Sequence, residues 1–247
     1  MTLRRSGTAG GRSRHGEGEL APISVRLQIL ATEHWSLLAT RSLTWTESFS
    51  RAQMFLSVLS GAVVALALVA QATSFGAGFV AFALVTLPVV LFVGLTTFIR
   101  LVAANNDEAR WVLGMNRIRA AYLELAPELE PYFITGHHDD EKGLMVTTGY
   151  ADFPTFYGYV TTPAVVGVID GVVAATIVFV AAGQLDAVSP FAAFLAVVTF
   201  VVWNVALSRY VAQDRRRRPL VGPAVNPTPA NESAASDERQ SLRIPDG

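Results

Sequence analysis

Apolar residues gather along the chain into four long runs, separated by polar stretches. Each run has about the 20 residues that a helix needs to cross the hydrocarbon core of a bilayer. A helix on the surface of a soluble protein would instead carry a polar face at helical spacing. We therefore predict an all-α membrane protein with four transmembrane helices, at Met54–Ala72, Phe79–Ile99, Pro163–Gly183 and Phe191–Leu207.

The first two of these helices are expected to continue beyond the membrane. The stretch before the first run lacks helix breakers after Pro22, and one helical face carries Leu27, Leu30, His34 and Leu37. Only a short turn joins the two runs, so both extensions leave the membrane side by side. We predict that they form a cytosolic helical hairpin.

A packing stripe follows the second run and repeats at helical spacing until Pro127, a residue that breaks helices. The stripe is expected to bury against the partner helix, against Tyr132 and Phe133, or against another subunit. Its five members are Trp111, Met115, Ile118, Tyr122 and Leu125.

Composition changes along the chain predict six segments. The first is a disordered basic N-terminus, and the last joins a basic cluster to a disordered tail. Between them lie two long helices, a loop with an aromatic interfacial segment and a hairpin of the third and fourth spans. The predicted boundaries are 1–21, 22–72, 73–126, 127–162, 163–214 and 215–247.

The distribution of positive charge orients these segments. All 19 Lys and Arg residues lie outside the four runs, and the connections at 74–78 and 184–190 contain none. Because positive flanks stay on the cytoplasmic side, both termini are predicted to be cytoplasmic in a multi-pass protein of the cell inner membrane. A composition of 51% apolar and 16% charged residues agrees with the lipid bilayer as its main partner.

A basic cluster follows the fourth run and is formed by Arg215, Arg216, Arg217 and Arg218. Such a cluster anchors the end of a spanning helix, or it attracts anionic lipid head groups at about 1 kcal/mol per charge. Because the cationic residues belong to membrane flanks throughout the chain, no nucleic-acid partner is predicted.

Asp170, inside the third run, is the strongest candidate for chemistry. An ionisable group within a spanning helix is costly and normally faces protein or water. Asn204 in the fourth run lies at a similar depth, so a hydrogen bond between the two side chains would satisfy both. Three interpretations stay open: a structural clasp with Asn204, a proton or ion pathway, or a side chain that reaches out to the interface.

Small residues at every fourth position predict close helix contacts in the first and third runs. They are Ser57, Gly61 and Ala65 in the first run, and Gly167, Gly171 and Ala175 in the third.

Motifs for catalysis and for metal binding are absent from the sequence. The chain has no cysteine, and it contains no phosphate-binding glycine loop, nucleophile elbow or zinc-protease motif. His137, His138, Asp139, Asp140 and Glu141 carry metal-binding groups, but adjacent side chains seldom point at one ion. We predict that these five residues form a solvated loop and do not bind a metal ion. For the whole chain we predict no enzymatic activity and no cofactor.

The sequence LFVGLTTFIR at 91–100, together with GMNRIRAAYLELAPELEPYFITGHHDDEKG at 114–143, resembles an uncharacterised family of bacterial four-span integral membrane proteins. The resemblance covers roughly residues 27–159. The order of helix, two spans and helix is more distantly similar to SLATT-type two-span domains, which are thought to act as pore-forming effectors in bacterial conflict systems. This chain adds a second pair of spans.

These patterns favour a structural or sensing component of an oligomeric membrane assembly, expected to be a homo-oligomer. The alternative is an ion or proton channel, or a transporter-like pore, that uses Asp170 and acts in stress or conflict.

Overall fold

The computed structural model describes residues 21–149, 161–184, 189–217 and 222–229. Within these ranges the chain is helical and contains no strand. Four helices are long and apolar enough to cross a membrane, which confirms the predicted all-α fold with four candidate spans. The elements are α1 (Ile23–Thr73), α2 (Ala77–Leu125), the 3-10 helix η1 (Pro127–Tyr132), α3 (Glu141–Thr148), α4 (Thr162–Gly183) and α5 (Ser189–Arg217).

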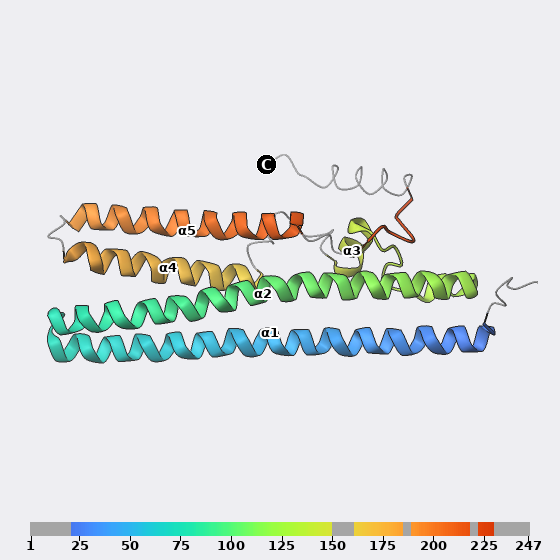
Figure 1. Ribbon diagram of the computed structural model, residues 1–247, viewed down its shortest axis with the longest axis horizontal. Coiled ribbons are helices and arrows are strands. Elements are labelled where there is room, and N and C mark those ends of the chain that lie inside the picture. The colour runs from blue at the N-terminus through green and yellow to red at the C-terminus, as the bar shows by residue number, and fades with distance from the viewer. Residues whose placement is uncertain (1–20, 150–160, 185–188, 218–221, 230–247) are drawn as a thin grey trace, which may run out of the picture.

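Helices α1 and α2 form one long antiparallel hairpin (Figure 1). The helix α1 begins directly after Pro22 and ends at Thr73, and the next residue, Ser74, takes a left-handed conformation with φ of 48°. Phe75 is also left-handed, with φ of 59°, so the chain reverses within a few residues before α2 begins. With 51 and 49 residues, the two helices each extend roughly 75 Å.

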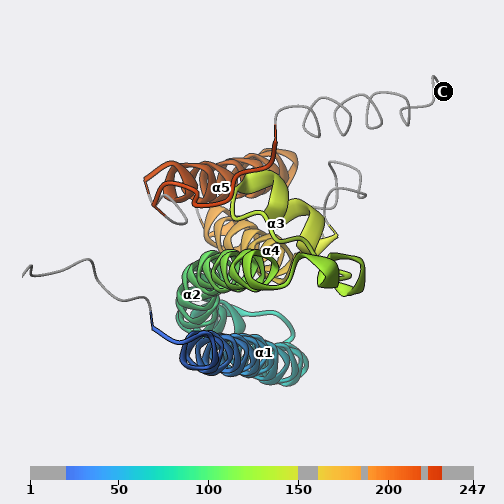
Figure 2. The ribbon, with the colours of Figure 1, turned by 90° about the vertical axis from the view of Figure 1, so that its right-hand side faces the viewer.

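The four long helices lie in a single row, in the order α1, α2, α4 and α5 (Figure 2). They therefore pack pairwise rather than around a common axis. The shorter α4–α5 pair lies along one half of α2 only, so the other half of the α1–α2 hairpin projects beyond it (Figure 1). We call this part, residues 23–50 and 103–125, the projecting half.

A core of large apolar side chains joins α1, α2 and α4 in the half of the hairpin that carries the predicted spans. Phe55, Val90 and Leu101 are almost completely buried there, beside Val166 and Val173 of α4. In water, burial of these side chains would be the main force that holds α4 against α2. In a lipid bilayer the hydrophobic effect between helices is absent, and close packing of the same side chains holds the helices together.

The packing stripe of α2 lies in the projecting half and meets α1 at Tyr122. Met115 and Ile118 are buried, and the ring of Tyr122 stacks on His34 at 6.0 Å between centroids. Tyr132, one of the other expected neighbours of the stripe, is 79% exposed. Leu27, assigned to the same face as His34 by its spacing, is 40% exposed and lies off the contact.

A belt of charged side chains joins α1 to α2 where the apolar stretches end. Glu47 accepts hydrogen bonds from Arg51 at 2.9 Å and from Arg100 at 3.0 Å, and Arg41 pairs with Glu108 at 3.0 Å. Because Arg100 is bound through two nitrogen atoms, the guanidinium is fixed in direction as well as in distance. The belt separates an apolar half of the hairpin from a projecting half with a mixed surface.

Candidate functional site

Asp170 lies at the contact between α4 and α2, where it is 0% exposed. Its carboxylate rests on the backbone of α2 at Gly94, because a side chain at Gly94 would overlap the carboxylate atoms. Neither carboxylate oxygen has a hydrogen-bond partner among the described residues. A buried polar group without a partner is rare in folded proteins, and such a group usually indicates a function or a bound species.

The predicted hydrogen bond between Asp170 and Asn204 is not formed, since the structure gives the Asp170 carboxylate no partner in its described part. The amide of Asn204 donates instead to the carbonyl of Phe200 in its own helix, at 2.9 Å. Asn204 lies against Gly171, one residue after Asp170. Consecutive helical residues point about 100° apart, so Asp170 meets α2 while Gly171 meets α5.

The two ridges of small residues have different surroundings. In α4, Gly167 lies against Leu207 of α5 and Phe98 of α2, and Gly171 lies against Phe200 and Asn204 of α5. This ridge is therefore a place where α5 closely approaches α4. In α1 no atom lies within 4 Å of the position where a Gly61 side chain would begin, so that ridge faces outward.

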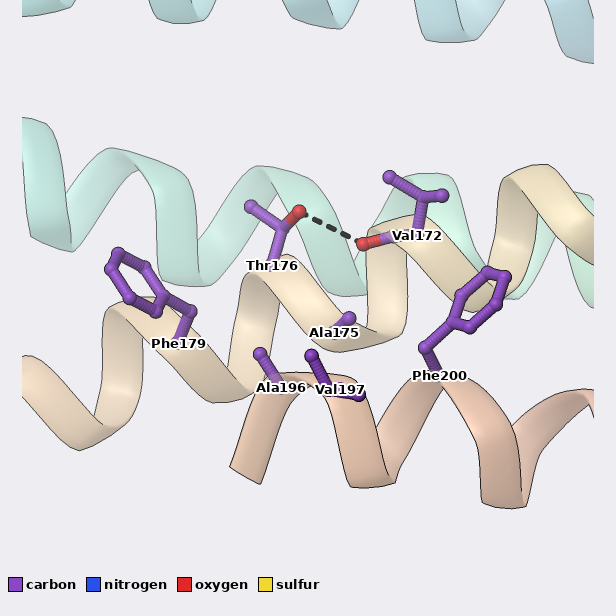
Figure 3. Close-up of a pocket in the computed structure, with 7 residues that line it drawn as sticks. All are labelled: Val172, Ala175, Thr176, Phe179, Ala196, Val197 and Phe200. Atoms are coloured by element: carbon purple, nitrogen blue, oxygen red, sulfur yellow. Dashed lines mark hydrogen bonds between the residues drawn. The ribbon is translucent and has the colours of Figure 1, made fainter. Parts of the chain in front are cut away.

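An open groove runs between α4 and α5 (Figure 3). Its one hydroxyl, from Thr176, donates to the carbonyl of Val172 at 2.8 Å and presents no free polar group to a ligand. The groove therefore suits a hydrocarbon chain and offers no catalytic chemistry. Its lining consists of Val172, Ala175, Thr176, Phe179, Ala196, Val197 and Phe200.

The acidic loop before α3 is a docking site for the chain's own tail rather than the predicted solvated loop. The described residues hold no group of His and acidic side chains placed to bind a metal ion. Asp139 instead accepts hydrogen bonds from the backbone N–H of Val225 at 2.9 Å and of Asn226 at 2.8 Å. Arg117 of α2 donates to the same carboxylate at 2.6 Å, so Asp139 is satisfied although its side chain is fully buried.

Asp140 continues the same arrangement one residue later. Its carboxylate accepts the backbone N–H of Thr228 at 2.7 Å and the Thr228 hydroxyl at 2.8 Å. It also accepts the backbone N–H of Gly143 at 2.8 Å, which caps the N-terminus of α3. The two aspartates thus hold an extended segment beside α3 (Figure 1). We call Arg117, Asp139 and Asp140 the tail clasp.

Asn116, completely buried in α2, fixes the loop that carries the tail clasp. Its amide nitrogen donates to the carbonyl of His138 at 2.8 Å, and its amide oxygen accepts from Arg119 at 2.7 Å. The loop also passes so close to α3 that a side chain at Gly143 would overlap the His138 carbonyl. Backbone and side chain together place both aspartates on the flank of α2.

The electrostatic environment of the tail clasp favours ionised carboxylates. Burial alone would raise the pKa of Asp139, but the N–H groups of Val225 and Asn226 and the Arg117 guanidinium outweigh it and lower the pKa. Asp140 follows the same balance, in which the hydrogen bonds from Gly143 and Thr228 outweigh burial and lower its pKa. Both side chains are therefore acceptors at neutral pH, as the docked tail requires.

The segment predicted as a basic cluster and disordered tail, residues 215–247, is partly ordered. Arg215, Arg216 and Arg217 continue α5, and all three are exposed. Residues 222–229 are the docked segment, and the loop accepts three of its backbone N–H groups. Arg218 and the aromatic residues Tyr150–Tyr159 lie outside the described residues.

No protein-family model matches the chain, and neither a curated protein nor a solved structure matches it. The class of protein is thus defined by the fold itself. The described part of the chain is all-helical, and four of its helices are each long and apolar enough to cross a membrane once. The resemblance to bacterial four-span proteins and to SLATT-type domains stays a prediction.

Sequence reasoning missed Gly94, Arg117 and the docked tail. Gly94 interrupts an apolar run at a depth close to that of Asp170, counted from the same ends of their spans, and that coincidence was the available signal. The sequence of the tail gave a weaker signal. The loop binds the tail through backbone N–H groups, which every residue except proline possesses, so no particular residue type marks the contact.

Proposed function

We propose that the protein is a non-enzymatic structural or sensing component of an oligomeric membrane assembly. It is embedded in the cell inner membrane with both termini and the projecting half in the cytoplasm. One observation carries the proposal: the projecting half of α1 displays an exposed apolar stripe. Trp35, Leu38, Trp45 and Phe49 are 72%, 41%, 41% and 51% exposed. We call these four residues the outer stripe.

The outer stripe has the spacing of a helix-packing seam. Its members are separated by three, seven and four residues, which places them on one face of α1. An apolar face of this size on a water-exposed helix marks a protein interaction site. Because α1 and α2 are unbroken between the projecting half and the apolar half, a contact at the outer stripe is mechanically connected to the Gly94–Asp170 contact.

The occupant of the outer stripe is proposed to be a second copy of the chain, which makes the assembly a homo-oligomer. The test is the variant Leu38→Glu/Trp45→Glu, purified in detergent and weighed by mass photometry beside the natural chain. We expect the natural chain to be oligomeric and the variant to shift to a smaller species. Thr46→Glu, at an exposed polar position of the same helix, is the matched control and should keep the natural mass.

A monomeric natural chain, or equal masses for all three proteins, would contradict the role of the outer stripe. Topology is tested separately with reporter fusions after Glu141. A periplasmic signal at that position would place the projecting half outside the cytoplasm and overturn the proposed orientation.

A second function is favoured by the unpartnered carboxylate of Asp170. In this alternative the protein conducts protons or ions, as a channel, a transporter-like pore or a stress or conflict effector. Because Asp170 is 0% exposed, its route would open only when α4 moves relative to α2. Asp170→Asn in proteoliposomes should then abolish flux without changing the assembled mass, whereas absence of flux from the natural protein would eliminate this function.

A further inference from the structure

The docked tail and the tail clasp are complementary donor by donor. Between residues 225 and 228 the backbone offers N–H groups at Val225, Asn226 and Thr228, and each is accepted by Asp139 or Asp140. The remaining position is Pro227, which has no N–H to satisfy. Before this stretch, the carbonyl of Pro223 accepts from Arg117 at 3.4 Å. Every backbone N–H group between residues 225 and 228 therefore has an acceptor in the clasp.

The tail clasp is held in place by contacts that do not involve the tail. Arg117 fixes Asp139, Gly143 binds Asp140 through its backbone N–H, and Asn116 holds the carbonyl of His138. A site whose acceptors are positioned in advance spends little conformational entropy on binding. These contacts are what a binding site needs in order to persist when its occupant leaves.

The occupant is tethered close to the site. Four residues, 218–221, connect the end of α5 to the docked segment. The end of α5 is itself attached to α2, because Asn106 donates to Asp214 at 2.6 Å. A tether this short gives the segment a high effective concentration at the clasp of its own chain.

We propose that Arg117, Asp139 and Asp140 form a binding site for extended, proline-containing peptides, and that residues 223–228 are its tethered, exchangeable occupant. The site recognises backbone N–H groups at three of four consecutive positions and a hydroxyl at the last. Docking of the tail adds a second link between the end of α5 and the projecting half of α2, beside the hydrogen bond from Asn106 to Asp214, and release removes that second link. This inference is independent of the outer stripe and of ion flux.

The absence of native cysteine makes the docking directly measurable in the full chain. Ala224→Cys in the tail and Asn105→Cys on α2 place two spin labels on exposed positions. Asn105 lies twelve residues before Arg117, or about 18 Å along the helix axis, within the range of pulsed dipolar spectroscopy. We expect one narrow distance distribution for the natural tail.

Variants in the tail test the contacts without disturbing the clasp. Val225→Pro/Thr228→Pro removes two of the three N–H donors and should broaden the distance distribution. Glu141→Gln changes an exposed carboxylate of the same loop and should leave it narrow. A broad distribution for the natural chain, or a narrow one for the proline variant, would overturn docking by these hydrogen bonds.

Exchange is tested with a fluorescent peptide that has the sequence of residues 222–229. It should bind the full-length proline variant at least tenfold more tightly than the natural chain, whose site is occupied. Adding Asp139→Ala to the proline variant should remove that binding. Equal binding to the natural chain and the proline variant would overturn the exchangeable site. Loss of the dipolar signal on dilution with unlabelled chains would show that the occupant comes from another copy, which would overturn the tethered assignment.

Discussion

Two buried aspartates of this chain have opposite surroundings. Asp139 is 3% exposed and Asp170 is 0% exposed, so both carboxyls are removed from water. Asp139 accepts hydrogen bonds from two backbone N–H groups and from Arg117, whereas the oxygens of Asp170 have no partner among the described residues. Burial alone does not distinguish the two residues; the number of their partners does.

The difference assigns the two residues to different roles. A carboxylate with all its partners stabilises the structure around it, and its removal leaves donors and a positive charge unmatched. A carboxyl without partners contributes no such stabilisation, so its presence in a helix suited to crossing a membrane makes it a candidate for a role beyond folding. Asp139 is therefore a structural centre of the projecting half, and Asp170 is the better candidate for function.

The largest effect is expected at the residue that makes room for Asp170. In Gly94→Val the new side chain would overlap the carboxylate, and overpacking of this kind costs about 3 kcal/mol. The free energy of unfolding, measured by circular dichroism during detergent-induced unfolding, should fall by that amount. Combining Gly94→Val with Asp170→Gly should restore most of the loss, because the overlapping group is removed.

Gly61→Val is the matched control for the same substitution in another spanning helix. No atom lies within 4 Å of the position where its side chain would begin, so we expect little change in the unfolding free energy. Equal losses at both glycines would mean that valine perturbs any spanning helix, and the contact between Gly94 and Asp170 would then lose its significance.

The second effect concerns Asp139→Asn. In this variant an amide nitrogen, which is a donor, would replace a carboxylate oxygen, which is an acceptor. Val225, Asn226 and Arg117 all donate hydrogen bonds to this side chain, so at least one donor would lose its acceptor. Lost charge-assisted hydrogen bonds of this kind cost about 2 kcal/mol in unfolding free energy. The measurement is the same unfolding titration, with Glu141→Gln as the exposed control in the same loop. If Glu141→Gln lowered the unfolding free energy by the same amount, the cause would be the change in net charge and not the loss of hydrogen bonds in the tail clasp.

The same change at the other aspartate should have a smaller effect of opposite sign. Asp170→Asn keeps the shape of the side chain but removes a group whose charged form has no partner. We expect the unfolding free energy to be unchanged or to rise by up to about 1 kcal/mol. A loss as large as that of Asp139→Asn would reveal a stabilising partner for Asp170 and would erase the contrast between the two residues.

The spans could be predicted from the sequence because their cause is local. An apolar run of about 20 residues between polar turns forms a membrane-crossing helix whatever its neighbours are. The third run was placed at Pro163–Gly183, and α4 occupies Thr162–Gly183. Pro163 at the first turn explains this agreement, since proline favours the start of a helix.

The site could not be predicted as well, because it depends on helix rotation and on backbone contacts. Similar depth suggested that Asp170 binds Asn204, but depth does not fix rotation, and the two residues face different neighbours. The contact between Asp170 and Gly94 joins helices far apart in the sequence, and no local pattern specifies it. The docked tail lacks apolar periodicity, and its order comes from two carboxylates that accept its backbone N–H groups.

The smallest expected effect is the pH dependence of tail docking, which bears on Asp139 and Asp140 only. The N–H groups of the docked tail help to lower the pKa of both carboxyls, together with Arg117 at Asp139 and Gly143 at Asp140. The stabilisation from docking is therefore complete above the pKa of a free aspartate, about 4, and is lost as the pH falls through the lower docked values. Arg117 forms an ion pair with Asp139, and residues 222–229 contain no titratable side chain.

Hydrogen exchange at the amides of Asn226 and Thr228 measures this dependence in the full chain. Protection, corrected for the intrinsic pH dependence of exchange, should stay constant from neutral pH to about 5 and decrease at lower pH. Protection lost well above pH 5 would contradict control by the two aspartates. Protection that survives full protonation of the carboxyls would show that the tail is held by contacts other than the two aspartates.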